Sequence, residues 1–107
     1  MINIGGEWWR VLLVSPHHPL LKMGNGKYAV GVCDDPLKTI AVSDALDCYQ
    51  LRNVLCHELT HAAMYSYNIE LGYEQEEIIA NLFAAHGQEI IDTANLFFKT
   101  KNGELIC

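Results

Sequence analysis

The chain has 107 residues, half of them apolar, which is enough for one globular domain over residues 1–107 with a single core. Thirteen Asp and Glu residues against seven scattered Lys and Arg residues give a formal net charge of −6, and this balance argues against intrinsic nucleic-acid binding. The chain has neither an apolar run of the roughly eighteen residues that a membrane span needs nor a secretory signal at its start, so we expect a cytoplasmic protein without a membrane partner.

The first 43 residues contain three segments with the composition of β-strands. Residues 7–14 are aromatic and β-branched, and we expect a strand that is largely buried on both faces. Residues 28–33 and 39–42 have the same character and are separated by a turn at 34–36, so they predict a hairpin. The sequence therefore predicts a small, mostly antiparallel sheet of about three strands.

Two polar pairs in this region have ordinary explanations. His17 and His18 lie in a loop bracketed by prolines, where adjacent side chains seldom reach one metal ion, and we interpret them as solvated. Asp34 and Asp35 precede a proline, a combination that is typical of a turn. The candidate functional residues therefore lie further along the chain.

Two long helices are predicted after the strands, which makes the fold class α+β. Ser43 is the expected N-cap of a helix from about residue 44 to about 66, and residues 73 to about 99 predict a second. The histidines of the first helix lie on the side opposite its apolar side, which is expected to face the core. The apolar side consists of Cys48, Leu51, Leu55, Leu59, Ala62 and Ala63. The tail at 100–107 is expected either to add a short strand or to fray.

The first helix carries the sequence His57-Glu58-Leu59-Thr60-His61. Residues i and i+4 lie one turn apart on the same face of a helix, so both imidazoles can bind a single Zn²⁺ ion. Glu58 is displaced by about 100° around the helix, where the general base of the His-Glu-x-x-His metalloproteases is found. A carboxylate at this offset can take a proton from a zinc-bound water, whose pKa the metal lowers to about 7. The pattern predicts His57 and His61 as metal ligands and Glu58 as the catalytic base.

A catalytic zinc site needs a third protein ligand, and the second helix offers several candidates. The apolar stripe of that helix includes Ala80, Phe83 and Ile90, and Glu77 lies at its margin. Glu77 is the preferred third ligand, and Glu76 is the second choice. Asn81 is one turn beyond Glu77 and can orient a histidine ligand through the other ring nitrogen. His86 is the rival ligand, but it lies far along the helix on another side.

The four cysteines are Cys33, Cys48, Cys56 and Cys107. They are predicted to be thiols, because they lack CxxC spacing and are expected in a reducing compartment. Cys56 neighbours His57 in sequence, yet on a helical wheel it points away from the histidine face. We therefore expect it to pack in the core rather than bind the metal.

The residues around the motif resemble the ImmA/IrrE-type metallopeptidases, which are typical of phages and mobile elements. The resemblance covers about residues 38–90, where the motif is followed by Glu77-Ile-Ile-Ala-Asn-Leu-Phe-Ala84. In that family a Glu-x-x-Ala-Asn-x-Phe-Ala segment supplies a glutamate ligand, and this glutamate corresponds to Glu77. A weaker match is to the SprT-like proteases, whose third ligand is a histidine in a His-Gly pair, here His86-Gly87.

The resemblance implies a minimal, gluzincin-like zincin domain with Zn²⁺ as its cofactor and a protein or peptide as its substrate, such as a repressor-type regulatory protein. In zinc peptidases of this kind an edge strand beside the metal helix receives the substrate backbone, and the hairpin at 28–42 is the candidate. The expected function is therefore that of a zinc metalloendopeptidase. The alternative is a zinc-stabilised interaction module that keeps the fold without catalysis.

Overall fold

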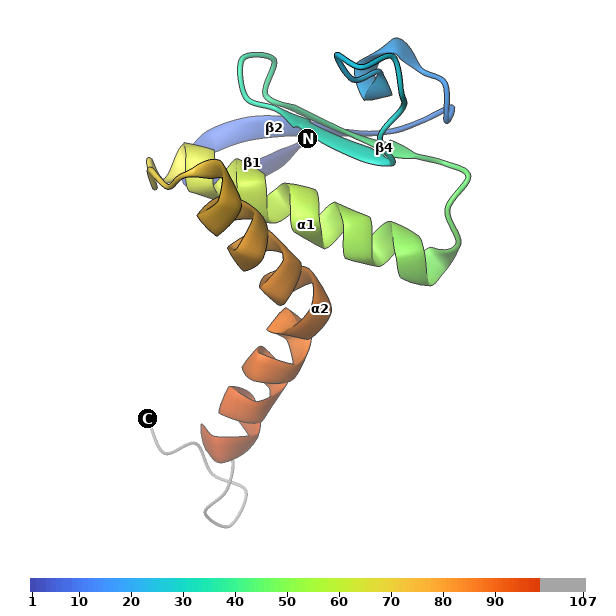
Figure 1. Ribbon diagram of the computed structural model, residues 1–107. Coiled ribbons are helices and arrows are strands. Elements are labelled where there is room, and N and C mark those ends of the chain that lie inside the picture. Colours follow the sequence, from blue (N-terminus) through green and yellow to red (C-terminus); the bar gives the residue numbers. More distant parts are fainter. Residues whose placement is uncertain (99–107) are drawn as a thin grey trace.

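The computed structural model of the chain, which describes residues 1–98, consists of a four-stranded sheet and two long helices (Figure 1). The elements in chain order are β1 (Ile2–Ile4), β2 (Glu7–Val14), the 3-10 helix η1 (Pro19–Leu21), β3 (Gly31–Asp34), β4 (Thr39–Ser43), α1 (Cys48–Ser66) and α2 (Tyr73–Phe98). The predicted α+β class is confirmed. The tail at 100–107 and Cys107 lie outside the described residues.

The sheet has four strands because the chain begins with a short strand that the sequence reasoning missed. β1 and β2 form an antiparallel hairpin in which Ile4 pairs with Glu7. Gly5 and Gly6 connect them with φ values of 58° and 88°, the left-handed conformations that a tight hairpin turn requires. The Gly-Gly pair was the available signal for this hairpin.

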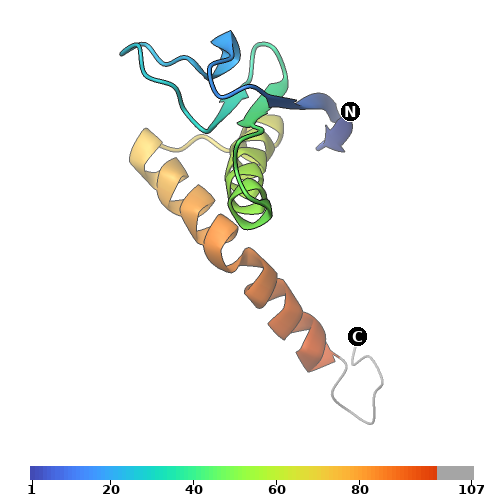
Figure 2. The same ribbon diagram turned by 90° about the vertical axis from the view of Figure 1, so that its right-hand side faces the viewer.

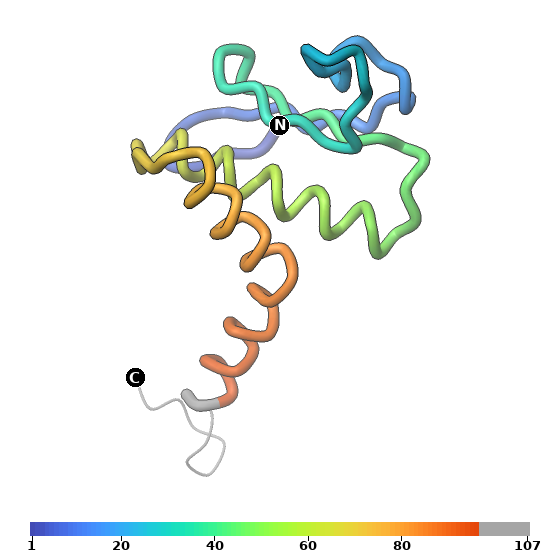
Figure 3. Tube along the Cα trace, in the orientation of Figure 1, coloured from blue at the N-terminus to red at the C-terminus, as the bar shows by residue number. Residues whose placement is uncertain are grey.

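The strand order is β1-β2-β4-β3, and it combines antiparallel and parallel pairings. β4 pairs with β3 in an antiparallel ladder and with β2 in a parallel one, with Leu12 opposite Ala41. The chain trace in Figure 3 shows the connection from β2 to β3 passing over the face of the sheet that is opposite the helices. η1 lies in this connection, and its Leu21 is fully buried. β4 is therefore covered on both faces, and all five of its residues are buried.

Both long helices lie on one side of the sheet (Figure 2). Trp9 on β2 is fully buried and its indole nitrogen donates to Ser66 Oγ of α1 at 2.8 Å. Trp8 is 60% exposed and Arg10 is also exposed, so the prediction that this strand is buried on both faces is wrong. The reason is that α1 covers only the face of β2 that carries Trp9.

The main core lies between the sheet and α1, and its fully buried members are Trp9, Ile40, Val42 and Ala62. The predicted apolar side of α1 contributes Leu51, Leu55 and Leu59, which pack against this cluster. Cys48 is exposed because it is the first residue of the helix. The leucine side of α1 thus faces the core, as the sequence predicts.

The start of α1 differs from the prediction. The helix begins at Cys48, and Asp47 is its N-cap, in a capping box with Gln50. Ser43 is instead the buried last residue of β4, and its hydroxyl accepts a hydrogen bond from the Ala45 amide. Ser43 and Asp47 are both residue types that cap helices well. Because β4 extends one residue further than predicted and includes Ser43, the helix starts after Asp47.

The end of α1 reverses the chain so that α2 packs beside α1. Asn68 adopts φ 55°, and the Ile69 amide donates to the Met64 carbonyl at 2.8 Å, as in a Schellman motif. α2 then begins at Tyr73, as predicted, and contacts α1 through Glu76 and Glu77, which reach His61, and through Ala84, whose carbonyl accepts from Asn53. This arrangement brings the acidic start of α2 to the histidines of α1.

The distal half of α2 extends beyond α1, as both ribbon views show (Figures 1 and 2). Ala80 is fully buried, but Phe83 and Ile90 of the predicted apolar stripe are about half exposed. Within residues 1–98, no helix is long and apolar enough to cross a membrane.

Strand β3 is an edge of the sheet and approaches α1 closely. A Cβ atom on Gly31 would lie 2.5 Å from Val54 Cγ1 and 3.2 Å from Glu58 Cγ. Only a residue without a side chain permits this approach. The edge strand is therefore held directly beside the helix that carries the histidines.

Candidate metal centre

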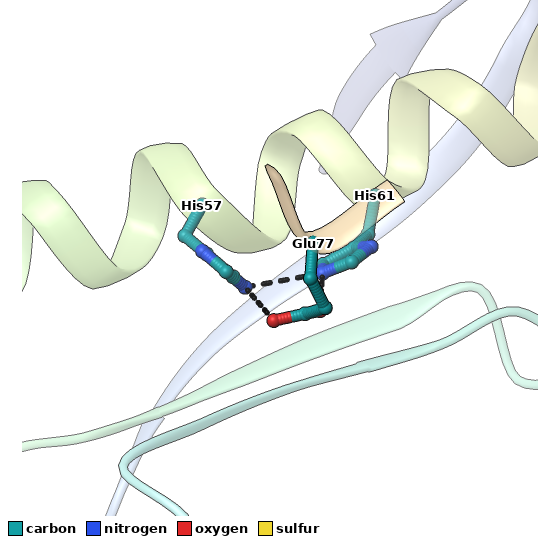
Figure 4. A group of neighbouring side chains, drawn as sticks. All are labelled: His57, His61 and Glu77. Carbon is teal, nitrogen blue, oxygen red and sulfur yellow. Dashed lines mark hydrogen bonds and ion pairs between the residues drawn. The ribbon is translucent and has the colours of Figure 1, made fainter. Parts of the chain in front are cut away.

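His57 and His61 lie one turn apart on α1, and Glu77 reaches them from the start of α2 (Figure 4). The helical period puts both imidazoles on the same face of α1, and the reversal after Asn68 turns α2 towards that face. The three side chains converge, with one ligand atom from each within 4.8 Å of the others. That they bind a metal ion stays a prediction.

The separations between the ligand atoms suit a tetrahedral ion. The Nε2 atoms of His57 and His61 are 3.1 Å apart, and the Glu77 carboxylate oxygens lie 2.7 Å from His61 Nε2 and 3.5 Å from His57 Nε2. Ligands at zinc distances of about 2.0–2.2 Å in tetrahedral geometry lie about 3.3 Å from each other. The side chains therefore need only small shifts to hold such an ion.

The chemistry of this cluster also calls for a cation. Lone pairs on two imidazole nitrogens and a carboxylate oxygen repel one another at these separations unless a proton or a metal ion lies between them. Two nitrogens and one oxygen are a common donor set for Zn²⁺, and imidazole also binds other first-row divalent ions. The residues present thus fit a metal of this class.

Glu76 binds the other side of the His61 ring. Its Oε1 atom is 2.6 Å from His61 Nδ1, and the two side chains are 15% and 11% exposed. Asn81 was expected to orient a histidine, but it is exposed and makes no side-chain hydrogen bond within the described residues. Glu76, expected as the reserve ligand, thus contacts the nitrogen that faces away from the cluster.

The remaining candidates lie elsewhere. His86 is exposed and is roughly two and a half helical turns beyond Glu77. His17 packs edge-on against Tyr28, and the Nδ1 atom of His18 caps η1 by accepting from the Leu20 amide. Cys56 lines a cavity between α1 and α2 that contains none of the three converging residues.

Glu58 is buried beside the cluster, with only 8% of its surface exposed. Burial raises the pKa of its carboxyl above the ordinary value, and the neighbouring His61 and His57 partly oppose this shift. β3 covers Glu58 at Gly31, which accounts for the burial. Its raised pKa makes this carboxylate a stronger proton acceptor than that of an exposed glutamate.

Two cavities flank Glu58 and open along strand β3. One of about 430 Å³ is lined by Asn53, Val54 and His57, and the other, of about 520 Å³, by Cys33, His61 and Tyr65. Both cavities share five lining residues: Ala29, Gly31, Glu58, Tyr73 and Glu77. The cluster therefore lies in the wall of a cleft bounded by an edge strand and two helices.

Sequence reasoning missed Tyr73 and Cys33, which only the packing of separate elements places in the cleft. Burial and the charge of Glu58 raise the pKa of the Cys33 thiol to about 12, so this thiol is protonated at neutral pH. Burial also raises the pKa of Tyr65, which follows the motif on α1. Tyr65 also lines the cleft.

The fold and the converging side chains define a small α+β protein in which two histidines and a glutamate with the spacing of a metal site meet in an open cleft. Residues 13–91 match the family described as the IrrE N-terminal-like domain, which is a peptidase family. The match covers more than half of the chain, and the chain therefore belongs to this family, as its resemblance to the ImmA/IrrE-type proteins predicts. Comparison with curated proteins and with solved structures found no significant match.

Proposed function

We propose that this protein is a zinc-dependent metallopeptidase that hydrolyses peptide bonds in a protein substrate. The observation that supports this proposal best is the convergence of His57, His61 and Glu77 beside the buried carboxyl of Glu58. Membership of a metallopeptidase family supports it independently. In the proposed site His57, His61 and Glu77 would hold the Zn²⁺ ion.

Bound Zn²⁺ supplies two kinds of chemistry, because it polarises the scissile carbonyl and lowers the pKa of a bound water. The Glu58 carboxylate would take a proton from the attacking water and deliver it to the leaving amine. The carboxylate must be ionised for the first step and protonated for the second. Its raised pKa brings these two states closer in free energy at neutral pH than in an exposed glutamate.

The edge strand β3 is the proposed binding site for the substrate backbone. Within the described sheet, β3 pairs with β4 alone, so the opposite edge offers free N–H and C=O groups. Gly31 on this strand lines both cavities that flank Glu58. A peptide added along β3 therefore passes beside the proposed base. The resemblance to ImmA/IrrE-type proteins favours a regulatory protein of a phage or mobile element as the substrate.

The alternative, a zinc-stabilised module without catalysis, predicts a fourth protein ligand that closes the site. Among the residues that the structure describes, the metal-ligand group has three members. A structural site also gives no reason to bury Glu58 at a cleft between two cavities. Both observations support the peptidase over the module.

The test combines metal analysis with cleavage of a diverse peptide library followed by mass spectrometry. We expect the wild-type protein to bind one equivalent of Zn²⁺ and to cleave peptides, and Glu58→Gln to keep the zinc but lose cleavage. Glu74→Gln is the matched control, because Glu74 is an exposed carboxylate at the start of the same helix as Glu77. Undiminished cleavage by the Glu58→Gln variant would refute the proposed base.

The metal ligands are tested in the same way. Glu77→Ala is expected to lose zinc, whereas His86→Ala is expected to retain it, because His86 is exposed and remote from the cluster. The reverse result contradicts the ligand set. A wild-type protein that contains zinc with four protein ligands and cleaves nothing supports the structural module instead.

A further inference from the structure

The Glu76 carboxylate has no part in the reaction described above, although it contacts the proposed metal site. Its Oε1 atom lies 2.6 Å from His61 Nδ1, and its side chain is more shielded than that of Glu77, at 15% against 30% exposed. Shielding from water strengthens a hydrogen bond between an imidazole and a carboxylate. The contact is thus a strong one in a place where water competes weakly.

We propose that Glu76 is a positioning residue, which holds the His61 ring with its Nε2 atom directed at the metal. This inference rests on the proposed metal site and assigns no reacting group to Glu76. An ionised carboxylate only accepts hydrogen bonds, so Glu76 requires the proton of the His61 ring to be on Nδ1. The lone pair of the neutral ring is then on Nε2, the atom that faces His57 and Glu77.

The order of two residues in α2 explains how both nitrogens of one ring are engaged. Glu76 and Glu77 are adjacent, so their side chains leave the helix about 100° apart and lie on either side of the His61 ring. The Glu76 amide is itself held by the Gly72 carbonyl at 3.0 Å, within the first turn of the helix. The backbone of Glu76 is therefore fixed where its carboxylate meets the ring.

The two histidines differ in the hydrogen bonding of their Nδ1 atoms. Within residues 1–96, whose side chains the structure describes, His57 Nδ1 makes no hydrogen bond comparable to that of His61 Nδ1. Outer partners of this kind set the tautomer and orientation of metal-binding histidines, and their loss typically reduces metal affinity by about 10–100-fold. Removal of Glu76 should therefore loosen one ligand and leave the other unchanged.

The first measurement is the affinity for Zn²⁺, from competition with a chromophoric chelator. Glu76→Ala is expected to bind Zn²⁺ about 10–100-fold more weakly than the wild type. Glu76→Gln should lose less, because its amide oxygen still accepts a hydrogen bond from Nδ1. Glu74→Ala is the control, since Glu74 is an exposed acidic residue in the same turn. Equal affinities of the Glu76→Ala and Glu74→Ala variants overturn the proposal.

The second measurement observes the ring proton directly. In the zinc-loaded wild type, ¹H–¹⁵N NMR of the histidine rings should show a His61 Nδ1 proton that is shifted downfield and exchanges slowly with water. This signal should weaken in Glu76→Gln and vanish in Glu76→Ala, while the His57 signals persist. A His61 signal unchanged by both substitutions overturns the proposal. Glu76→Gln preserves the size of the side chain, so it tests the contact even if the alanine variant fails to fold.

A third measurement separates positioning from ligation. In protein loaded with Co²⁺, the intensity of the visible absorption bands reports the coordination number, and it should be the same in Glu76→Gln as in the wild type. A change in intensity makes Glu76 a ligand and overturns its role as a positioning residue. A wild-type protein that binds Zn²⁺ but cleaves no peptide refutes the proposed function alone, whereas one that binds no Zn²⁺ refutes both.

Discussion

Replacing Gly31 by alanine is expected to destabilise the protein and to impair catalysis, because it forces β3 away from α1. The added Cβ atom would lie 2.5 Å from Val54 Cγ1 and 3.2 Å from Glu58 Cγ. Carbon atoms pack at about 3.5–4.0 Å, so strand and helix must separate locally by roughly 1 Å. The displaced helix face is the one that carries the proposed base.

The expected magnitude follows from two opposing effects. Overpacking of this kind costs about 1–3 kcal/mol of unfolding free energy. The lower entropy of the unfolded chain in a Gly→Ala variant returns about 0.4–1 kcal/mol. The overpacking term is the larger, and we expect Gly31→Ala to lose about 1–2 kcal/mol. Cleavage should fall as well, since the carboxyl of Glu58 moves relative to the histidines.

Urea unfolding and peptide cleavage measure the two effects. Gly24→Ala is the matched control, because a Cβ atom at Gly24 would have no neighbour within 4 Å. Val54→Ala removes the methyl group that Gly31→Ala would clash with, so the double variant should be more stable than the sum of the two single losses predicts. Wild-type stability in Gly31→Ala, or strict additivity with Val54→Ala, would refute the proposed close approach.

Three further predictions concern the pKa values and the helix start. Burial raises the pKa of Glu58 in the folded protein above its ordinary value of 4.5. The protonated carboxyl therefore favours folding, and this contribution is complete below the unfolded-state pKa and is lost as pH rises through the folded-state pKa. Glu58→Gln should therefore raise the thermal unfolding midpoint of the metal-free protein at pH 7, and an unchanged or lower midpoint contradicts this. The pKa of Cys33 is raised to about 12, so iodoacetamide at pH 8 should alkylate the exposed Cys48 well before Cys33. Mass spectrometry of the peptides measures both rates, and equal rates contradict the prediction. Asp47→Ala breaks the capping box with Gln50 and should cost about 1 kcal/mol in urea unfolding, and no loss contradicts its role as N-cap.

The helices and the motif were predictable because their signals are local. The spacing of His57 and His61 places them on one face of any helix that contains both, whatever surrounds it. The predicted start of α2 at Tyr73 agrees with the structure. Local signals did not decide the start of α1, because Ser43 and Asp47 are both good N-caps and only the length of β4 selects Asp47.

The sheet was harder to predict because its pairings join distant segments. The parallel ladder of β2 and β4 connects residues about thirty positions apart, and alternation within either strand does not reveal the direction of its partner. The different burial of Trp8 and Trp9 likewise depends on which face α1 covers. Neither fact is present in the short-range pattern.

The sequence by itself determined the chemistry available to this protein: two histidines at metal-binding spacing, a carboxyl beside them, and acidic residues at the start of the next helix. Which of those acidic residues meets which nitrogen was decided only by the tertiary structure. A helical wheel relates Glu76, Glu77 and Asn81 to each other, but the reversal after α1 and the packing of α2 set their position relative to His61. Glu77 consequently faces the cluster, Glu76 binds the opposite side of the ring, and Asn81 is left exposed.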